Sequence, residues 1–223
     1  RAAWTMVLTT LLWSSAGVVT RQLAHAQGFE VTFWRSFFTV VSLLLILPLW
    51  QGPRVFARMP WRQGAFWLSG WCWAVMFTAF MVALTMTGVA RVLVTMALGP
   101  LLTALLARVV TGHRLPARTW VAIMLGGAGM AWMFAGQMGE ATSSSAWMGS
   151  LVALGVPAAA AVNWTVVQRS QAHGESIDLV PAVLLGAVIS SAVTLPLAWP
   201  LTAGGRDLAW LAARHGLAMA VGS

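Results

Sequence analysis

Long, continuously apolar stretches alternate along the chain with short segments rich in polar residues, Gly and Pro. A helix of about 20 residues crosses a hydrocarbon core of about 30 Å, and most of the stretches reach that length. None shows the alternation of apolar and polar positions that a membrane β-strand requires, so helices are predicted. The seven predicted spans are Ala2–Thr20, Val31–Trp50, Gly64–Thr85, Ala90–Val110, Thr119–Ala135, Trp147–Gln168 and Leu179–Trp199. An eighth stretch begins near Leu208.

Composition supports a membrane protein. The chain has 223 residues, of which 59% are hydrophobic and 8% are charged, and its mean hydropathy is +0.80. A soluble domain of this size cannot bury so much apolar surface, so the lipid bilayer is the expected surrounding. The net charge is +8, and the chain contains 13 arginines and no lysine. No polar domain is present to bind nucleic acid, so the arginines are expected to set membrane orientation.

The arginines of the connecting segments are unevenly divided between the two sides of the predicted membrane. Eight lie on the side of the N-terminus: Arg1, Arg54, Arg58, Arg62, Arg108, Arg114, Arg118 and Arg169. Four lie on the other side, namely Arg21, Arg91, Arg206 and Arg214, and Arg35 lies within a span. Because cytoplasmic loops carry the excess of positive charge, the N-terminus is predicted in the cytoplasm of a bacterial cell, with the protein in the inner membrane.

An internal repeat divides the chain. Residues 18–50 match residues 166–198 at ten of 33 positions without a gap, beginning with VVTRQLAH and VVQRSQAH. Five predicted spans separate the copies, and because five is odd, the second copy enters from the opposite side. This inverted topology is typical of secondary transporters. We expect a first five-helix repeat over residues 1–136, a linker over 137–146, and an incomplete second repeat over 147–223.

Several motifs carry a resemblance to a known family. Pro100 lies within an apolar helix, Gly112-His113-Arg114-Leu115 forms a short loop, and Gly126-Gly127-Ala128-Gly129 lies in the next helix. This pattern, together with LLWSSAGVVTRQL and FWRSFF near the N-terminus, resembles the EamA family of the drug/metabolite transporter superfamily. One departure is His113, which stands where the family has a loop Glu.

The resemblance implies an all-α polytopic fold of ten spans, of which about seven and a half are in this chain. It also implies cytoplasmic termini and a central cavity surrounded by spans one to four and six to nine. Members export amino acids and other small metabolites, and some carry drugs. Pro100 is expected to kink its helix, and Ala122/Gly126 and Gly127/Ala131 fit close helix packing.

Two arginines are candidates for binding a substrate carboxylate. Arg35 lies five residues into the second predicted span and is expected either to face the cavity, to pair with Glu30, or to extend toward the membrane surface as a structural residue. Arg91 begins the fourth span on the same side. No Asp or Glu lies inside a predicted span, which argues against exchange of organic cations for protons.

Polar and aromatic side chains within the spans are the other candidates. Asn163 and Trp164 interrupt the sixth span, and the repeat aligns them with the first, where Trp13, Ser14 and Ser15 lie. A mid-membrane amide needs a partner, either a ligand or another helix, so cavity lining and ordinary packing both stay open. Trp73 and Phe77 belong to an aromatic stripe of the third span that fits packing, interfacial anchoring or an apolar substrate.

These observations predict a secondary transporter that exports small, amino-acid-like metabolites by alternating access. The runner-up is an exporter of drugs or hydrophobic cations, and a different class is a non-transporting scaffold or an intramembrane enzyme. No nucleotide-binding loop, metal-ligand spacing or nucleophile motif is present, and Cys72 is the single cysteine, so neither a cofactor nor an enzymatic activity is predicted. The oligomeric state is left open.

Overall fold

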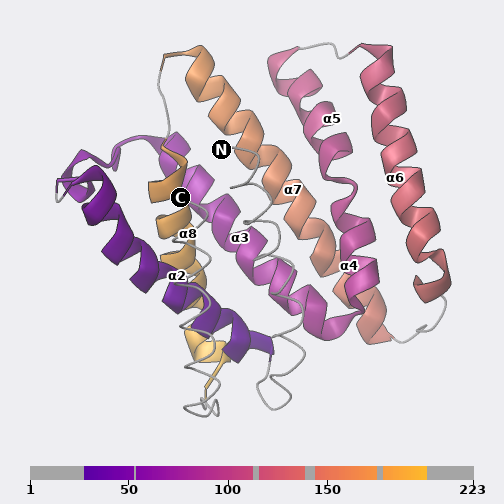
Figure 1. The fold of residues 1–223 in the computed structure, drawn as a ribbon, viewed down its shortest axis with the longest axis horizontal. Coiled ribbons are helices and arrows are strands. Elements are labelled where there is room, and N and C mark those ends of the chain that lie inside the picture. The colour runs from indigo at the N-terminus through magenta and orange to yellow at the C-terminus, as the bar shows by residue number, and fades with distance from the viewer. Residues whose placement is uncertain (1–27, 53, 113–115, 139–143, 175–177, 200–223) are drawn as a thin grey trace. The chain divides into compact units, whose positions relative to one another are not determined.

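The computed structural model describes residues 28–52, 54–112, 116–138, 144–174 and 178–199 (Figure 1). Within these ranges the regular elements are helices, and no strand occurs. They are α2 (Gly28–Gln51), the 3-10 helix η1 (Phe56–Arg58), α3 (Gly64–Met86), α4 (Val89–Met96), α5 (Gly99–Thr111), α6 (Ala117–Met138), α7 (Ser144–Ala172) and α8 (Leu179–Leu197). The predicted all-α polytopic class is confirmed.

In the described part of the chain, five segments are helical, long enough and apolar enough to cross a membrane. They are Phe29–Leu49, Gly64–Met86, Val89–Val110, Trp147–Ala172 and Leu179–Leu197. Each coincides with a predicted span. α6 occupies the position of the predicted span Thr119–Ala135, whose membrane crossing stays a prediction. The first predicted span and the stretch from Leu208 lie outside the described residues.

The chain divides into two compact units. One contains the described residues of the ranges 1–59 and 187–223, and the other contains residues 60–186. This division follows packing, and the inverted repeat with its linker over 137–146 stays a prediction. The second unit holds α3 to α7 and the first part of α8, and it contains the candidate site described below.

Glycines set the closest helix contacts of the unit 60–186. A Cβ atom on Gly186 of α8 would collide with the Trp73 Cβ atom and the Gly70 carbonyl oxygen of α3. A Cβ on Gly149 of α7 would lie 2.8 Å from the Met86 Cβ atom at the end of α3. In a bilayer, where helices gain little from leaving lipid, such close backbone approach is a main source of association. These contacts fix α3 against α7 and against the start of α8.

The contact of Gly149 also establishes helix directions. α7 begins beside the end of α3. Because α4 also begins there, a short turn after α3 ends, α7 and the α4–α5 segment run in the same direction (Figure 1). α3 runs in the opposite direction. The end of α5, the start of α6 and the end of α7 therefore lie at one end of this unit. The described arginines at this end of the unit are Arg62, Arg108, Arg118 and Arg169.

The fourth predicted span is interrupted in its middle. α4 ends at Met96 and α5 begins at Gly99, and the Leu98 N–H donates to the Thr95 carbonyl, three residues back rather than four, at 3.1 Å. Pro100 occupies the first turn of α5 and has no N–H for the Met96 carbonyl. The predicted effect of Pro100 on its helix is confirmed in the form of a break rather than a simple bend.

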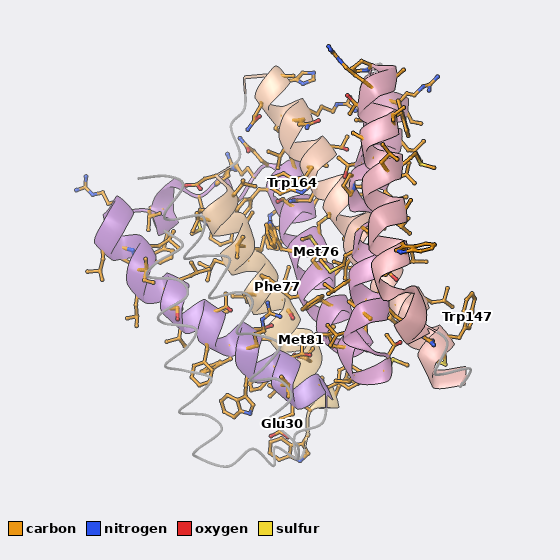
Figure 2. The ribbon with its side chains drawn as sticks, turned by 45° about the vertical axis from the view of Figure 1, so that its right-hand side comes forward. Glu30, Met76, Phe77, Met81, Trp147 and Trp164 are labelled. Carbon is orange, nitrogen blue, oxygen red and sulfur yellow. The ribbon has the colours of Figure 1, made fainter. Side chains whose placement is uncertain are left out.

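Large apolar side chains cover the outer surface of the described helices. Trp132 of α6 is 86% exposed, and Trp147 of α7 projects away from the neighbouring helices (Figure 2). Such a surface is stable against acyl chains and not against water. A Cβ atom added at Gly126 or Gly127 of α6 would meet no described atom within 4 Å, so the expected small-residue packing has no partner among the described residues.

One acidic residue lies at the start of a candidate membrane span. The sequence pattern puts Glu30 before the second span, but Glu30 lies in the first turn of α2, inside the candidate span Phe29–Leu49, and is only 1% exposed (Figure 2). A carboxylate in the first turn interacts favourably with the positive end of the helix dipole. Glu30 is at a helix end, as the sequence indicates, and no described carboxylate lies deeper within a span, so the argument against exchange of organic cations for protons stays a prediction. In the same unit, the hydroxyls of Ser36 and Ser190 lie 3.0 Å apart in a buried hydrogen bond.

Candidate functional site

A pocket of about 1120 Å³ lies between α5 and α7 in the unit 60–186. It is open to the surroundings and mostly apolar. Its lining residues are Gly99, Pro100, Thr103, Ala104, Ala107 and Val110 of α5, Ile123 of α6, and Ala160, Trp164, Gln168, Arg169, Ala172 and His173 at the end of α7. The volume is slightly above the range of about 300–1,000 Å³ that is usual for small-molecule sites, and apolar walls with a few polar groups are typical of such sites.

One stripe of α7 forms a wall of the pocket. Ala160, Trp164, Gln168 and Ala172 follow one another at intervals of four residues, which places them on the same helix face. The small residue Ala160 leaves room beside the indole of Trp164, which is 41% exposed. An indole offers a flat apolar surface and one hydrogen-bond donor, so this wall can contact an apolar or aromatic body.

The break between α4 and α5 lies at the inner end of the pocket. A Cβ on Gly99 would lie 3.8 Å from the Pro157 Cβ atom, so α5 and α7 are in contact at this level. Pro100 also lines the pocket and leaves the Met96 carbonyl without its usual helical donor. Interrupted helices with polar backbone groups are tolerated in a membrane where they line a cavity, and in transporters they mark binding sites.

Polar side chains gather at the other end of the pocket. Gln168, Arg169 and His173 lie there, and a ring nitrogen of His173 is 2.7 Å from the Arg169 carbonyl oxygen. A second pocket of about 360 Å³ lies at the same end of α7, lined by Ala65, Leu68, Val166, Arg169, Ser170 and His173. Arg169 and His173 thus line both cavities. The arginine in the last turn of α7 also complements the negative end of the helix dipole.

Asn163 lies on a different face of α7 from its neighbour Trp164. It is 0% exposed, and the Ser69 hydroxyl of α3 donates to its side-chain oxygen at 2.6 Å. The amide nitrogen is buried and has no hydrogen-bond partner among the described residues. Whichever way the amide is turned, one half pairs with Ser69 and the other half is not satisfied by a described group. Asn163 therefore belongs to the contact of α3 and α7 and does not line the larger pocket.

Trp73 and Phe77 lie on α3, away from the residues that line the larger pocket. Their ring centroids are 5.6 Å apart, and the Cβ atom of Trp73 lies against Gly186. The indole nitrogen of Trp73 is buried without a hydrogen-bond partner in the described ranges. These contacts are those of helix packing. A binding role for the two side chains stays a prediction.

The remaining predicted residues are not brought together with the pocket. Arg91 lies on α4, near its start, and its carbonyl accepts a hydrogen bond from the Thr95 hydroxyl at 2.8 Å. Arg35 lies on α2 in the other unit, where its carbonyl accepts a hydrogen bond from Thr39 at 2.9 Å. Trp13, Ser14 and Ser15 lie outside the described residues. Of the nine predicted residues, Trp164 lines the larger pocket.

Sequence reasoning misses Gln168 and Arg169 as part of the same site. The signal is present, because Gln168 follows Trp164 by one helical turn and the two share a face of the span. The sequence pattern presents Arg169 as an orientation signal alone. It also misses Gly99, because a proline in the fourth span predicts a kink and not a wall of a cavity.

The comparisons with known proteins agree with this architecture. The model of the EamA-like transporter family matches residues 1–135, which is more than half of the chain. Searches of curated proteins and of solved structures gave no match. The matched region includes the broken fourth span formed by α4 and α5, and α6 as far as residue 135. The family consists of transporters rather than enzymes. The helical membrane fold and this match together establish that the chain belongs to the EamA-like transporter family.

Proposed function

We propose that this protein exports small, amino-acid-like metabolites across the bacterial inner membrane by alternating access, with its N-terminus in the cytoplasm. One observation carries the proposal. A pocket of about 1120 Å³ extends from a break in the middle of a membrane span to an arginine-bearing end of the helices, with Trp164 exposed along its wall. A membrane scaffold has no need of such a cavity, because an empty cavity loses packing contacts.

The break between α4 and α5 supports a transport cycle. A span made of two short helices can change the angle between them by altering a few backbone dihedrals, whereas a continuous helix is stiff. The predicted inverted repeat supplies the second element, because two similar half-bundles can exchange which side of the membrane is open. Substrate would bind beside the break and be released when α5 moves relative to α7.

The charge of the pocket favours metabolites over hydrophobic cations. Arg169 lines it, and none of its described lining residues is acidic. A cationic drug in a site of low dielectric needs a carboxylate or several strong acceptors, which these walls do not supply. Export of cations is therefore the second candidate, and the two are separated by testing which class of compound leaves the cell.

Replacing Trp164 with Ala should reduce export without reducing the amount of protein in the membrane. Loss of an aromatic surface from a binding site lowers affinity by about 1 kcal/mol or more, so export at low substrate concentration should fall about fivefold to tenfold. The measurement compares excreted metabolites from cells that overproduce the intact protein or its Trp164→Ala form, with membrane levels determined by immunoblot.

The matched control is Trp132→Ala. Trp132 is also an exposed tryptophan of a long helix, but it does not line the pocket, so its loss should leave export unchanged. Equal export by the parent protein and the Trp164 variant would refute the site. An unchanged metabolite profile when the parent protein is overproduced would refute export of metabolites and direct attention to drugs or to a scaffold role.

A further inference from the structure

We propose that the pocket between α5 and α7 selects apolar monocarboxylates over zwitterions and cations with the same apolar body. The carboxylate would bind at Arg169, and the apolar body would lie against Trp164. The inference narrows the substrate class of the proposed function, from amino-acid-like metabolites to those that carry the carboxylate without the ammonium group, and it rests on that function only for the transport of the bound compound. Binding selectivity itself is independent of transport.

The first argument is the distribution of charge. Arg169 brings a guanidinium group with several N–H donors to the pocket, and His173 donates through Nδ1 to the Arg169 backbone carbonyl. Within the described lining no carboxylate is available to pair with a ligand ammonium group. A carboxylate entering this pocket gains a bidentate partner, whereas an ammonium group loses its hydration without replacement. An ordinary amino acid carries both groups, so its carboxylate finds a partner in the pocket and its ammonium group does not.

The inner end of the pocket has partial charges of both signs, because α4 ends and α5 begins there. α5 begins at Gly99, which lines the pocket there, so the positive end of the helix dipole lies at the inner end. The half-helices of transporters use the same arrangement toward anionic groups. The end of α4 with the Met96 carbonyl lies at the same place, so the partial charges of the two helix ends offset each other, and the preference for a carboxylate rests on Arg169 at the outer end. The helix end alone would not define a site, and the arginine provides the fixed charge.

The second argument is the distance between the apolar and the charged contact. Trp164 and Arg169 are five residues apart on α7, which is about 7.5 Å along the helix axis at 1.5 Å per residue. A compound with one ring and a short chain to a carboxylate has about this length. Gln168 lies between the two levels and can donate to the same carboxylate through its amide.

Three probes with one apolar body test the selectivity: 3-phenylpropanoate, phenylalanine and 3-phenylpropylamine. They carry a carboxylate, a carboxylate with an ammonium group, and an ammonium group. Binding of each is measured by calorimetry at neutral pH to the intact protein in nanodiscs of uncharged lipid. We expect 3-phenylpropanoate to bind about tenfold more tightly than either other probe, since hydrogen bonds to charged groups are of that strength.

Two arginine variants separate the site from general charge. Arg169→Gln should lower the affinity for 3-phenylpropanoate about tenfold and leave the amine unchanged. Arg108→Gln removes an arginine of α5 that does not line the pocket, and it should change none of the three affinities. Equal binding of all probes, or an affinity that does not respond to Arg169→Gln, would overturn the proposal. In that case Arg169 serves only the end of α7.

A flux measurement distinguishes this inference from the proposed function. Uptake of the same three probes is followed in proteoliposomes containing the intact protein. Selective binding of the monocarboxylate without flux would refute transport and leave the site in place. Flux of phenylalanine at a rate equal to that of 3-phenylpropanoate, without preferential binding, would support export and refute the selectivity.

Discussion

Asn163 and Trp164 are adjacent in sequence but serve different purposes because an α-helix turns by about 100° per residue. The amide points to α3, where it accepts a hydrogen bond from Ser69, and the indole points to the pocket beside α5. A polar pair inside a membrane span thus contributes one group to the cohesion of the bundle and one to the cavity. The position of each residue around the helix axis, and not its polarity, determines whether its side chain contacts a neighbouring helix or the cavity.

The contact of Ser69 and Asn163 should be measurable as a coupling energy. Both residues are fully buried, and removing either hydrogen-bond partner leaves the other unsatisfied. We expect a coupling of about 0.6 kcal/mol, and at most about 1.7 kcal/mol, from a double-mutant cycle of Ser69→Ala and Asn163→Ala. The free energy of unfolding is measured by titration of the purified protein with denaturing detergent.

The coupling is independent of transport, which provides its control. Trp164→Ala combined with Ser69→Ala should show energies that add without coupling, because Trp164 lies on a different face of α7 from the one that contacts Ser69. A coupling near zero for the first pair would mean that Asn163 is not held by Ser69. The side chain would then be available for the substrate role that the sequence suggests.

For single residues, the sequence predicts the position along a span well, but it predicts poorly which neighbouring helix or cavity the side chain faces. It identifies Asn163 and Trp164 as a polar interruption deep in a span, and both lie deep in α7. It does not reveal that Asn163 faces α3. A membrane helix has apolar residues on all sides, because protein covers one side and lipid covers the other. Hydrophobic periodicity, which orients helices in soluble proteins, is therefore uninformative here.

Among the helices, the closeness of α3 to its neighbours depends on residues that have no side chain. Gly70 and Gly186 bring α3 and the start of α8 into backbone contact, and Gly149 does the same for α7. The opposite case is α6, whose Gly126 and Gly127 have open space around them among the described residues. A glycine in an apolar helix therefore does not by itself indicate a helix contact.

Replacing Gly186 with Ala should destabilise the protein. The added methyl group would collide with the Trp73 Cβ atom and the Gly70 carbonyl, and backbone atoms cannot move aside as a flexible side chain can. The expected loss is about 1–3 kcal/mol in the free energy of unfolding, as for other overpacked sites. It is measured by the same detergent titration, with retention of monodisperse protein after purification as a second readout.

Gly127→Ala is the matched control for this packing. It adds the same methyl group to another apolar helix where no described atom lies within 4 Å, so the helix propensity of Ala should dominate. Stability should be unchanged or higher by up to about 1 kcal/mol. If both variants lose the same stability, the loss arises from α6 packing as well, and the contact of α3 with α8 is not special.

The sequence predicts which elements exist better than where they are interrupted. Hydropathy locates each of the spans that the described residues contain, because only apolar helices are stable in a bilayer. It presents Ala90–Val110 as one span, whereas the backbone is two helices separated at Ala97 and Leu98. Pro100 indicates a disturbance, but the geometry of the disturbance depends on contacts such as Gly99 with Pro157, which lie 58 positions apart in sequence.

For the whole molecule, the distribution of arginine predicts orientation. Arg62, Arg108, Arg118 and Arg169 lie at one end of the unit 60–186, and Arg91 lies near the other end, at the start of α4. Since positively charged loops remain in the cytoplasm, the end with four arginines should be cytoplasmic. The pocket, whose polar end carries Arg169, would then open toward the compartment from which an exporter takes its substrate.

Reporter fusions test this orientation. A fluorescent protein fused after Arg118 should fluoresce, and alkaline phosphatase at the same point should be inactive. The pattern should reverse after Gly88, because α4 and α5 together cross the membrane between the two points. Reversed signals would place the arginine-bearing end outside. Identical signals at both points would show that the broken helix pair does not form a complete span.

The family, the helical class and the positions of most spans follow from sequence because they depend on hydropathy and on motifs that are local. The pairing of α5 with α7 does not, since it joins segments separated by the whole of α6. Family resemblance predicts a cavity between half-bundles but does not say which side chains face it. That information depends on how α5 and α7 pack together, which no local pattern reveals.

The burial of Cys72 has a practical consequence. It is the single thiol of the chain and lies inside α3 with little exposed surface. A water-soluble maleimide or spin label should therefore react with a cysteine introduced at the pocket, for example at Thr103, much faster than with the native residue. The chain is already suited to site-directed labelling, and the opening of α5 from α7 can be followed as a change in probe mobility without first rebuilding the protein.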